Sequence, residues 1–242
     1  MLKIKNLGDR AEIFITGIVI DDTDANWLSR EDGKIVGYTY PADIKAQLDS
    51  LKGLPIDVHI ASDGGDVGAG IAIYNMLAGH DAPVVAYIDK WAASIASYIA
   101  MAASKIVMPS NTYMMIHNPQ AGTFGDAKEL RNTADWLEQL QDMLVRAYSN
   151  GENEATVREM MDKETWLTAT ECSELFGDKV EVVEPTELKA VACYSGLKTA
   201  PEALRGTTTP TPEQNDARDE NRGTREDILN ILRRSWSYEE KG

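Results

Sequence analysis

Short apolar runs alternate along this chain with segments whose apolar residues recur at helical spacing. The runs at residues 12–20, 56–60 and 83–88 are rich in valine and isoleucine and end at turn residues, so they predict three buried strands. Residues 41–51 and 67–78, which lie between these runs, have the apolar spacing of helices. Strand and helix therefore follow one another in the first part of the chain.

The second part continues this alternation. A helix that begins near Ser94 leads into two short apolar runs, residues 105–108 and 113–116, which predict further strands. Residues 126–148 then carry apolar residues along one face of a long helix, and residues 155–161 predict a shorter one. Repetition of strand and helix in this order predicts a layered α/β domain with crossover connections.

The composition changes after about residue 195. We predict one main domain over residues 1–195 and a flexible linker over residues 196–222, since the linker contains almost nothing to bury. Thr224 and Asp227 have the spacing of a helix N-terminus, and the apolar residues that follow predict an amphipathic helix within residues 223–242. At that length the helix is marginal alone, so we expect it to dock on a partner or fray.

The composition also excludes several classes of function. The 242 residues, 43% of them hydrophobic, can bury a large core, but a net charge of -15 argues against a nucleic-acid partner. The two cysteines, Cys172 and Cys193, lack metal-type spacing, and the chain has no phosphate-binding loop with which to use ATP. The start lacks a signal-peptide core, and the longest uncharged stretch, residues 91–104, is too short to span a bilayer. We therefore expect a cytoplasmic protein with no cofactor, no metal and no membrane contact.

Ser94 is the strongest candidate for a reactive side chain. It lies between an apolar run and a helix rich in small residues, where its hydroxyl would be near the positive end of the helix. A serine becomes a nucleophile when an imidazole takes its proton, and His117 follows an apolar run and precedes Asn-Pro, which would hold it at a strand end. We expect His59, inside a strand, and His80, after a helix, to be structural. The pair of Ser94 and His117 predicts a serine hydrolase.

A hydrolase also needs main-chain donors for the oxyanion that forms during acyl transfer. Gly64 and Gly65 follow the second apolar run, and glycine tolerates the backbone shapes and the close approach that aiming an amide at a carbonyl requires. Ile95 directly follows the candidate nucleophile and would supply a second amide. A glycine pair alone is usually just a turn, so this part of the site depends on its context.

Four strings of residues together resemble the Clp protease proteolytic subunit (ClpP) family. They are IASDGGDV at residues 60–67, GIAIY at 70–74, AASIA at 92–96 and MIHNP at 115–119. Each string is unspecific alone, but their order and spacing match the family over residues 11–185. The resemblance implies a ClpP and crotonase-like α/β fold of repeated ββα units with a long handle helix. It also implies Ser94 as nucleophile and His117 as general base, with the amides of Gly65 and Ile95 as the oxyanion hole.

The resemblance places the acidic member of a catalytic triad at Glu164, just before the string Trp-Leu-Thr-Ala, where the family has aspartate. A glutamate is one methylene longer and can still accept the imidazole N–H if its backbone retreats slightly. Asp162 is the rival candidate, and Glu164 could instead be one more solvent-facing acid. A second departure is Asp63, which stands where the family usually has proline. Without the proline, the sequence does not determine how rigid the glycine turn is.

The long helix at residues 126–148 resembles the family's handle, through which rings stack, so we expect a homo-oligomeric ring, heptameric or doubled. Glu164 and the C-terminal tail are similar to ClpP-like proteases encoded in phage and prophage head-assembly modules. That similarity implies a serine endopeptidase that cuts capsid or scaffold polypeptides during head maturation, in the cytoplasm of the host. A general ClpP-type peptidase fed by an ATPase unfoldase is an alternative.

Two further alternatives belong to other classes. A crotonase-type acyl-CoA enzyme would polarise a thioester with paired amides and would not need Ser94 or His117. An inactive ring-forming assembly protein is suggested by the substituted acid. It predicts normal rings and no cleavage of unstructured peptides.

Overall fold

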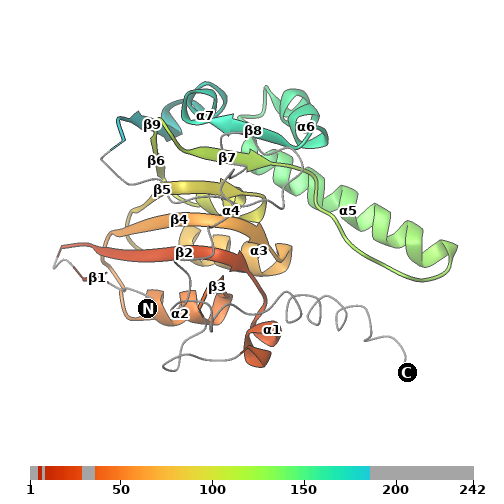
Figure 1. Ribbon diagram of the computed structural model, residues 1–242, viewed down its shortest axis with the longest axis horizontal. Coiled ribbons are helices and arrows are strands. Elements are labelled where there is room, and N and C mark those ends of the chain that lie inside the picture. Colours follow the sequence, from red (N-terminus) through yellow and green to blue (C-terminus); the bar gives the residue numbers. More distant parts are fainter. Residues whose placement is uncertain (1–4, 7–8, 29–35, 186–242) are drawn as a thin grey trace, which may run out of the picture. The chain divides into compact units, whose positions relative to one another are not determined.

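The computed structural model describes residues 5–6, 9–28 and 36–185. Figure 1 shows a mixed α/β fold in which helices accompany one sheet, and this confirms the fold class predicted from the apolar runs. The predicted linker, residues 196–222, and the predicted C-terminal helix, residues 223–242, lie outside the described residues.

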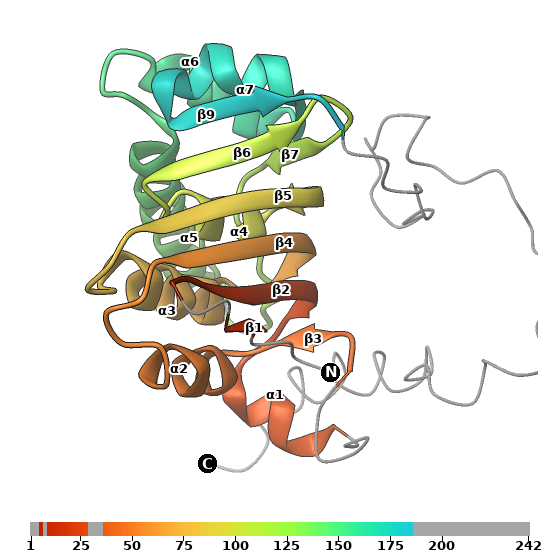
Figure 2. The same ribbon diagram turned by 90° about the vertical axis from the view of Figure 1, so that its left-hand side faces the viewer.

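Within the described residues the sheet has nine strands, and most of it is parallel. The strands are β1 (Lys5–Asn6), β2 (Ala11–Val19), β3 (Tyr38–Thr39), β4 (Ile56–Gly65), β5 (Val84–Ala93), β6 (Lys105–Pro109), β7 (Tyr113–Ile116), β8 (Thr165–Thr168) and β9 (Val180–Val183). The strands β2, β4, β5, β6 and β9 pair in parallel in that order (Figure 2). β1 pairs antiparallel with β2, and β3 pairs parallel with it.

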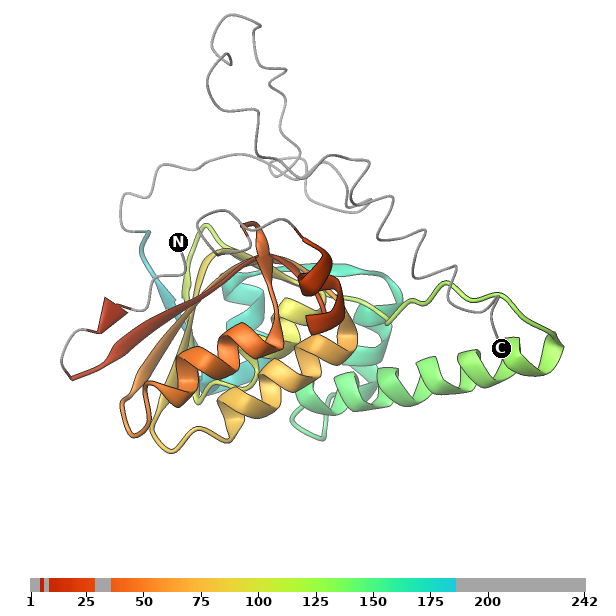
Figure 3. The same ribbon diagram turned by 90° about the horizontal axis from the view of Figure 1, so that it is seen from below.

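The helices lie between these strands along the chain. Those of the described residues are α1 (Asp22–Trp27), α2 (Pro41–Asp49), α3 (Val67–Ala78), α4 (Ile95–Ala100), α5 (Ala127–Tyr148), α6 (Glu154–Asp162) and α7 (Ala169–Phe176). Figure 3 shows α2 and α3 along the same face of the sheet. α3 begins at a cap, because the Asp66 carboxylate accepts a hydrogen bond from the Ala69 amide at 2.6 Å.

The sheet divides at β5. The first half of β5 pairs with β6, whereas its second half pairs with β7, where Ala93 lies opposite Met115. β7 in turn pairs with the antiparallel strand β8. We call these three strands the β5–β7–β8 branch, and the candidate residues Ser94, His117 and Glu164 each lie next to the end of one of its strands.

The core lies where the sheet meets its helices. In β2, Ala11, Ile13 and Ile15 are fully buried and the residues between them are half-buried, which is the alternation expected of a strand with one face in the core. α3 approaches α4 closely because Gly70 has no side chain, and a Cβ there would overlap the side chain of Ile95. The contact between α3 and α4 therefore lies at Ile95, one residue after the candidate nucleophile.

Some predicted elements need correction. β4 does not end at Ile60, because a register shift after that residue lets the strand continue through the glycine pair to Gly65. α1 lies where only a turn is predicted, and the Asp21 carboxylate caps it by accepting from the Asp24 amide at 2.7 Å. β8, α7 and β9 have no counterpart among the predicted elements.

The chain divides into two compact units, residues 1–119 with 138–189 and residues 120–137 with 190–242. The first unit holds the sheet. The described part of the second unit is a connecting segment followed by the first half of α5. None of the helices in the described residues is both long and apolar enough to pass through a membrane.

Candidate active site

Ser94 forms the turn between β5 and α4. The strand ends at Ala93 and the helix begins at Ile95, so one residue changes the chain from strand to helix. Ser94 has φ 55° and ψ -129°. This left-handed region costs a residue with a side chain roughly 1–3 kcal/mol, and it persists only where the surrounding structure enforces it. Sharp strand-to-helix turns expose the hydroxyl of the nucleophilic serine in α/β-hydrolases.

The Ser94 hydroxyl meets the ring of His117. Oγ of Ser94 lies 2.7 Å from Nε2 of His117, which is the distance of a hydrogen bond. Pairing of β5 with β7 brings the two residues together, because Ala93 lies opposite Met115 and the Ser94 amide donates to the Met115 carbonyl at 2.9 Å. The structure thus joins the two residues that the sequence suggests as nucleophile and base.

Glu164 lies at the same end of the branch. β7 and β8 pair with Ile116 opposite Thr165, so His117 and Glu164 are the next residues beyond that pair on the two strands. The φ of Glu164 is 51°. Among the described residues, Glu164 and Ser94 are the two residues other than glycine with a positive φ.

The surroundings of His117 keep its ring neutral. Burial lowers the pKa of His117 below its ordinary value of 6.5, and the nearby charge of Glu164 opposes this shift only in part. Near neutral pH the ring can therefore accept a proton at Nε2. Nδ1 is buried and has no hydrogen-bond partner among the described residues, so Glu164 acts on this ring through its charge.

Asp162, the rival acid, has other partners. Its Oδ1 accepts a hydrogen bond from Nδ2 of Asn118 at 2.8 Å and another from Nε2 of Gln141 at 3.2 Å. The same Gln141 nitrogen donates to Oδ1 of Asn118 at 2.7 Å. Asp162 therefore bonds the residue next to His117, whereas Glu164 is the acid whose charge shifts the pKa of the ring.

The glycine turn lies against Ser94. A Cβ on Gly64 would stand 2.6 Å from the Ala93 carbonyl oxygen and 2.8 Å from the Cβ of Ser94, so only glycine fits there. Gly65 approaches the Val19 carbonyl too closely for any Cβ, and its φ of 147° is also outside the usual range of other residues. Both glycines are therefore required by the space around them.

The two candidate oxyanion donors come from turns that touch each other. Gly65 ends β4, and Ile95 is the first residue of α4, where a helical amide has no carbonyl partner within its own helix. The Ile95 nitrogen would stand 3.1 Å from a Cβ on Gly64. In the same turn Asp63 accepts a hydrogen bond from the indole nitrogen of Trp91 at 2.6 Å, which ties the turn to β5.

The other two histidines have partners of their own. His59 stacks between the rings of Phe14 and Tyr87, and its Nδ1 lies 2.9 Å from Oδ1 of Asp89. Burial alone would lower the pKa of His59, but the hydrogen bond and charge of Asp89, together with the charges of Glu12 and Asp57, outweigh it and raise this pKa above the ordinary value. Nε2 of His80 lies 2.9 Å from a main-chain carbonyl oxygen. These contacts agree with structural roles.

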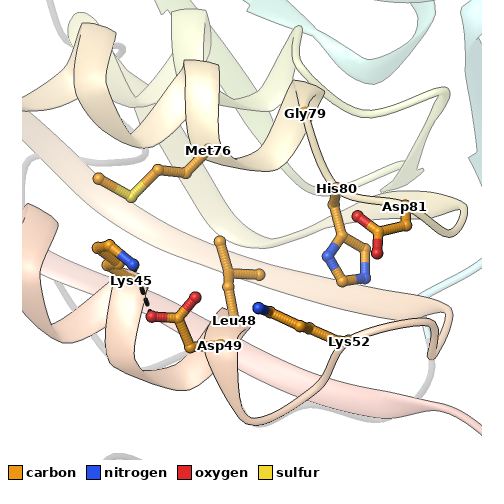
Figure 4. Close-up of a pocket in the computed structure, with 8 residues that line it drawn as sticks. All are labelled: Lys45, Leu48, Asp49, Lys52, Met76, Gly79, His80 and Asp81. Atoms are coloured by element: carbon orange, nitrogen blue, oxygen red, sulfur yellow. Dashed lines mark hydrogen bonds and ion pairs between the residues drawn. The ribbon is translucent and has the colours of Figure 1, made fainter.

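A cavity of about 230 Å³ lies between α2 and the end of α3 (Figure 4). It is lined by Lys45, Leu48, Asp49, Lys52, Met76, Gly79, His80 and Asp81. The Lys45 ammonium points to the Asp49 carboxylate, with which it pairs at 2.6 Å. No residue of the candidate site lines this cavity, so it is separate from the Ser94 turn. The described residues hold no cluster of three or more potential metal ligands.

Comparison with models of protein families matches residues 40–180 to the family described as Clp protease. The matched segment covers more than half of the chain and includes Ser94, His117 and Glu164. The chain belongs to the Clp protease family. This Clp family membership confirms the resemblance seen in the four strings, and it supports a peptidase.

Curated relatives carry the same family name. The chain is 38% identical over 125 residues to the ATP-dependent Clp protease proteolytic subunit 2 of Treponema denticola. This alignment covers 50% of this chain and 62% of that protein. It is 30% identical over 168 residues to the ATP-dependent Clp protease proteolytic subunit of Bacteroides fragilis, covering 67% of this chain and 74% of that protein. The aligned region thus covers less than two thirds of the Treponema denticola protein and about three quarters of the Bacteroides fragilis protein.

The candidate site of this Clp family protein contains two polar networks that are not predicted from the sequence. One joins Asn118, Gln141 and Asp162, and the other joins Ser97 to Tyr148. The partners are 21 to 51 residues apart, so no local spacing reveals them. The available signal is weak, namely a second serine one helical turn after the candidate nucleophile.

Proposed function

We propose that this Clp family protein is a serine endopeptidase with Ser94 as nucleophile, His117 as general base and Glu164 as the acid of the triad. The amides of Gly65 and Ile95 are the oxyanion donors. The 2.7 Å contact between Oγ of Ser94 and Nε2 of His117 carries the proposal. The lowered pKa of His117 supports it, because a base must be unprotonated to take a proton.

Peptide hydrolysis would run in two halves. Oγ of Ser94 attacks the carbonyl carbon while its proton passes to Nε2 of His117, and the amides of Gly65 and Ile95 bind the oxyanion. The imidazolium then gives this proton to the leaving amine as the C–N bond breaks, which leaves an acyl ester on Ser94. Water attacks the ester with His117 again as base, releasing the acid and restoring the serine.

Glu164 stabilises the imidazolium that forms in each half. The charge that it exerts on His117 supports this role over Asp162, whose carboxylate is bonded to Asn118. A full triad also needs a hydrogen bond at Nδ1 of His117, which is buried and has no partner among the described residues. The Glu164 carboxylate makes this bond when substrate or assembly closes the site, since catalytic hydrogen bonds often tighten only in the complex.

The substrate of this proposal is an extended polypeptide, specifically a capsid or scaffold protein of a phage or prophage head. Support comes from Glu164 and the charged tail after residue 195, the features that resemble head-maturation proteases. A homo-oligomeric ring, heptameric or doubled, would admit only threaded chains. Folded substrates would need an ATPase unfoldase as partner, because the chain carries no phosphate-binding loop. The name of the Bacteroides fragilis relative, an ATP-dependent Clp protease subunit, supports such a partner.

The decisive experiment compares the full-length wild type with Ser94→Ala. Both proteins are incubated with casein as an unstructured substrate, and the products are followed by mass spectrometry. Removing the nucleophile should lower kcat by at least about 10³-fold. Equal cleavage by Ser94→Ala would overturn the serine peptidase. Co-expression with head proteins then identifies which of them is cut.

A fluorophosphonate probe separates this function from the alternatives. The proposal expects labelling of the wild type at Ser94 and none of Ser94→Ala. A crotonase-type acyl-CoA enzyme would keep its activity after this substitution. An inactive assembly protein would form rings but would be neither labelled nor able to cleave casein.

A further inference from the structure

Two buried hydroxyl groups lie directly behind the Ser94 turn. Ser97 of α4 is fully buried, and Tyr148 at the end of α5 is 2% exposed. Their hydroxyl oxygens lie 2.8 Å apart. Oγ of Ser97 also lies 2.6 Å from the carbonyl oxygen of Ser94 and 2.9 Å from that of Met115. Four polar groups therefore meet around the fully buried side chain of Ser97.

The two carbonyl groups belong to the segments that carry the nucleophile and the base. One is the carbonyl of Ser94 itself. The other belongs to Met115, which lies two residues before His117 on β7 and also accepts the Ser94 amide at 2.9 Å. The Ser97 hydroxyl thus bridges the turn after β5 and the strand that leads to His117.

The direction of each hydrogen bond follows from the number of protons. A carbonyl can only accept, so the single proton of the Ser97 hydroxyl goes to the Ser94 or the Met115 carbonyl. The Tyr148 hydroxyl then donates to Oγ of Ser97. Burial raises the pKa of Tyr148 well above its ordinary value, so the tyrosine keeps its proton at neutral pH.

We propose that Ser97 and Tyr148 are positioning residues that hold Ser94 within reach of His117. The left-handed backbone of Ser94 is disfavoured unless neighbouring groups fix it, and the Ser97 hydroxyl is bonded to the carbonyl of that residue. Tyr148 holds the Ser97 hydroxyl in turn. The inference rests on the proposed serine mechanism and adds two residues that act on it from the core.

The test uses full-length Ser97→Ala, Tyr148→Phe and the double variant. In each we measure kcat and KM for casein cleavage and the rate of labelling by a fluorophosphonate. Because small displacements of a nucleophile are costly, Ser97→Ala should lower kcat and the labelling rate by about 10- to 100-fold with KM unchanged. Tyr148→Phe removes one hydrogen bond and leaves Ser97 its carbonyl acceptors, so we expect a loss of about two- to tenfold.

The double variant measures whether the two hydroxyls act as one unit. Ser97→Ala alone leaves the buried Tyr148 hydroxyl without its acceptor, and the double variant removes that unpaired group. We therefore expect Ser97→Ala/Tyr148→Phe to be no slower than Ser97→Ala. Losses that multiply would show two independent effects and would overturn the shared positioning role.

Ser104→Ala is the matched control. Ser104 also donates to a main-chain carbonyl, that of Val84 at 2.9 Å, but at the opposite end of β5 from Ser94. It should leave kcat, KM and labelling unchanged. The inference would be overturned if Ser97→Ala folds and has the same kcat and labelling rate as Ser104→Ala. A rise in KM of Ser97→Ala at constant kcat would also overturn it. If Ser97→Ala does not fold, the same comparison is made with Tyr148→Phe.

Failure of this inference can be told from failure of the proposed function. If Ser94→Ala cleaves casein as fast as the wild type, the serine mechanism itself is wrong. If Ser94→Ala is inactive and labelling is lost, but Ser97→Ala and Tyr148→Phe both behave like Ser104→Ala, only the positioning role is wrong.

Discussion

Ser94 and Glu164 share a backbone property that their side chains do not explain. Each has a positive φ, 55° and 51°, and each lies at a strand end of the β5–β7–β8 branch. Residues with a Cβ avoid this region, so its use at two ends of one branch is typical of a functional site. His117 lies at the third end of the branch, with its pKa lowered mainly by burial.

The pH dependence of activity should report the ionisation of His117. Only the neutral ring can act as base, so kcat/KM should rise with pH through the pKa of His117 and reach half its maximum below pH 6.5. The charge of Glu164 raises this pKa. Glu164→Gln should therefore move the midpoint to still lower pH and reduce kcat by up to about 10⁴-fold. A pH profile of fluorophosphonate labelling checks both shifts.

Asp162→Asn is the control for this experiment. Asp162 is bonded to Asn118 and is not among the charges that shift the His117 pKa, so the midpoint should stay where it is in the wild type. A midpoint that moves in Asp162→Asn and not in Glu164→Gln would make Asp162 the acid of the site.

At the level of single residues, the sequence indicates which residues are candidates for the site. It does not indicate which side chains contact one another in the folded protein. A serine at a strand end and a histidine before Asn-Pro are local patterns, and the structure places their side chains 2.7 Å apart. The hydroxyl pair of Ser97 and Tyr148 depends on residues 51 positions apart that meet only after the chain has folded. The positive φ of Glu164 likewise cannot be predicted from the presence of a glutamate at this position.

Among the structural elements, the glycine turn after β4 is the one most directly coupled to Ser94. Gly64→Ala would place a Cβ 2.6 Å from the Ala93 carbonyl oxygen and 2.8 Å from the Cβ of Ser94, at a φ of +88°. We expect loss of activity from displacement of Ser94, together with a lower free energy of unfolding. Casein cleavage and urea denaturation measure the two effects.

Gly53→Ala separates backbone strain from this clash. Gly53 also has a positive φ, +75°, but a Cβ there would meet nothing within 4 Å. It should lower the free energy of unfolding by about 1–2 kcal/mol and leave kcat unchanged. Gly64→Ala should cost about 1–3 kcal/mol more. Equal activity of the two variants would show that the turn does not position Ser94.

The elements that the sequence did not reveal are short or depend on distant partners. β9 has four residues with Glu181 among them, and it is a strand because it pairs with β6, more than 70 residues earlier. β8 is likewise formed by pairing with β7. α7 is different, since Thr168 and Glu171 form a capping box whose pattern is visible in the sequence. The long helices and central strands were predictable because their apolar periods extend over many residues.

For the whole molecule, we predict that the chain folds without its last 47 residues, about a fifth of the total. The buried hydrophobic residues of the described part end at Val180, so a chain ending at residue 195 should keep its thermal midpoint and its labelling at Ser94. A chain ending at residue 176 lacks β9 and should be much less stable, because β6 keeps its pairing with β5 but loses its pairing with β9. Circular dichroism and fluorophosphonate labelling compare the two. Unfolding of the longer form would assign the tail a structural role.

Asp63 gives the molecule a property that a proline in its place would remove. Its carboxylate holds the turn by a 2.6 Å hydrogen bond from the Trp91 indole. A pyrrolidine ring restrains the chain permanently, whereas this link can open and re-form within the folded state. If Gly65 supplies the oxyanion amide as we propose, a turn held by this hydrogen bond would adjust to bulky side chains next to the scissile bond that a proline-restrained turn would exclude.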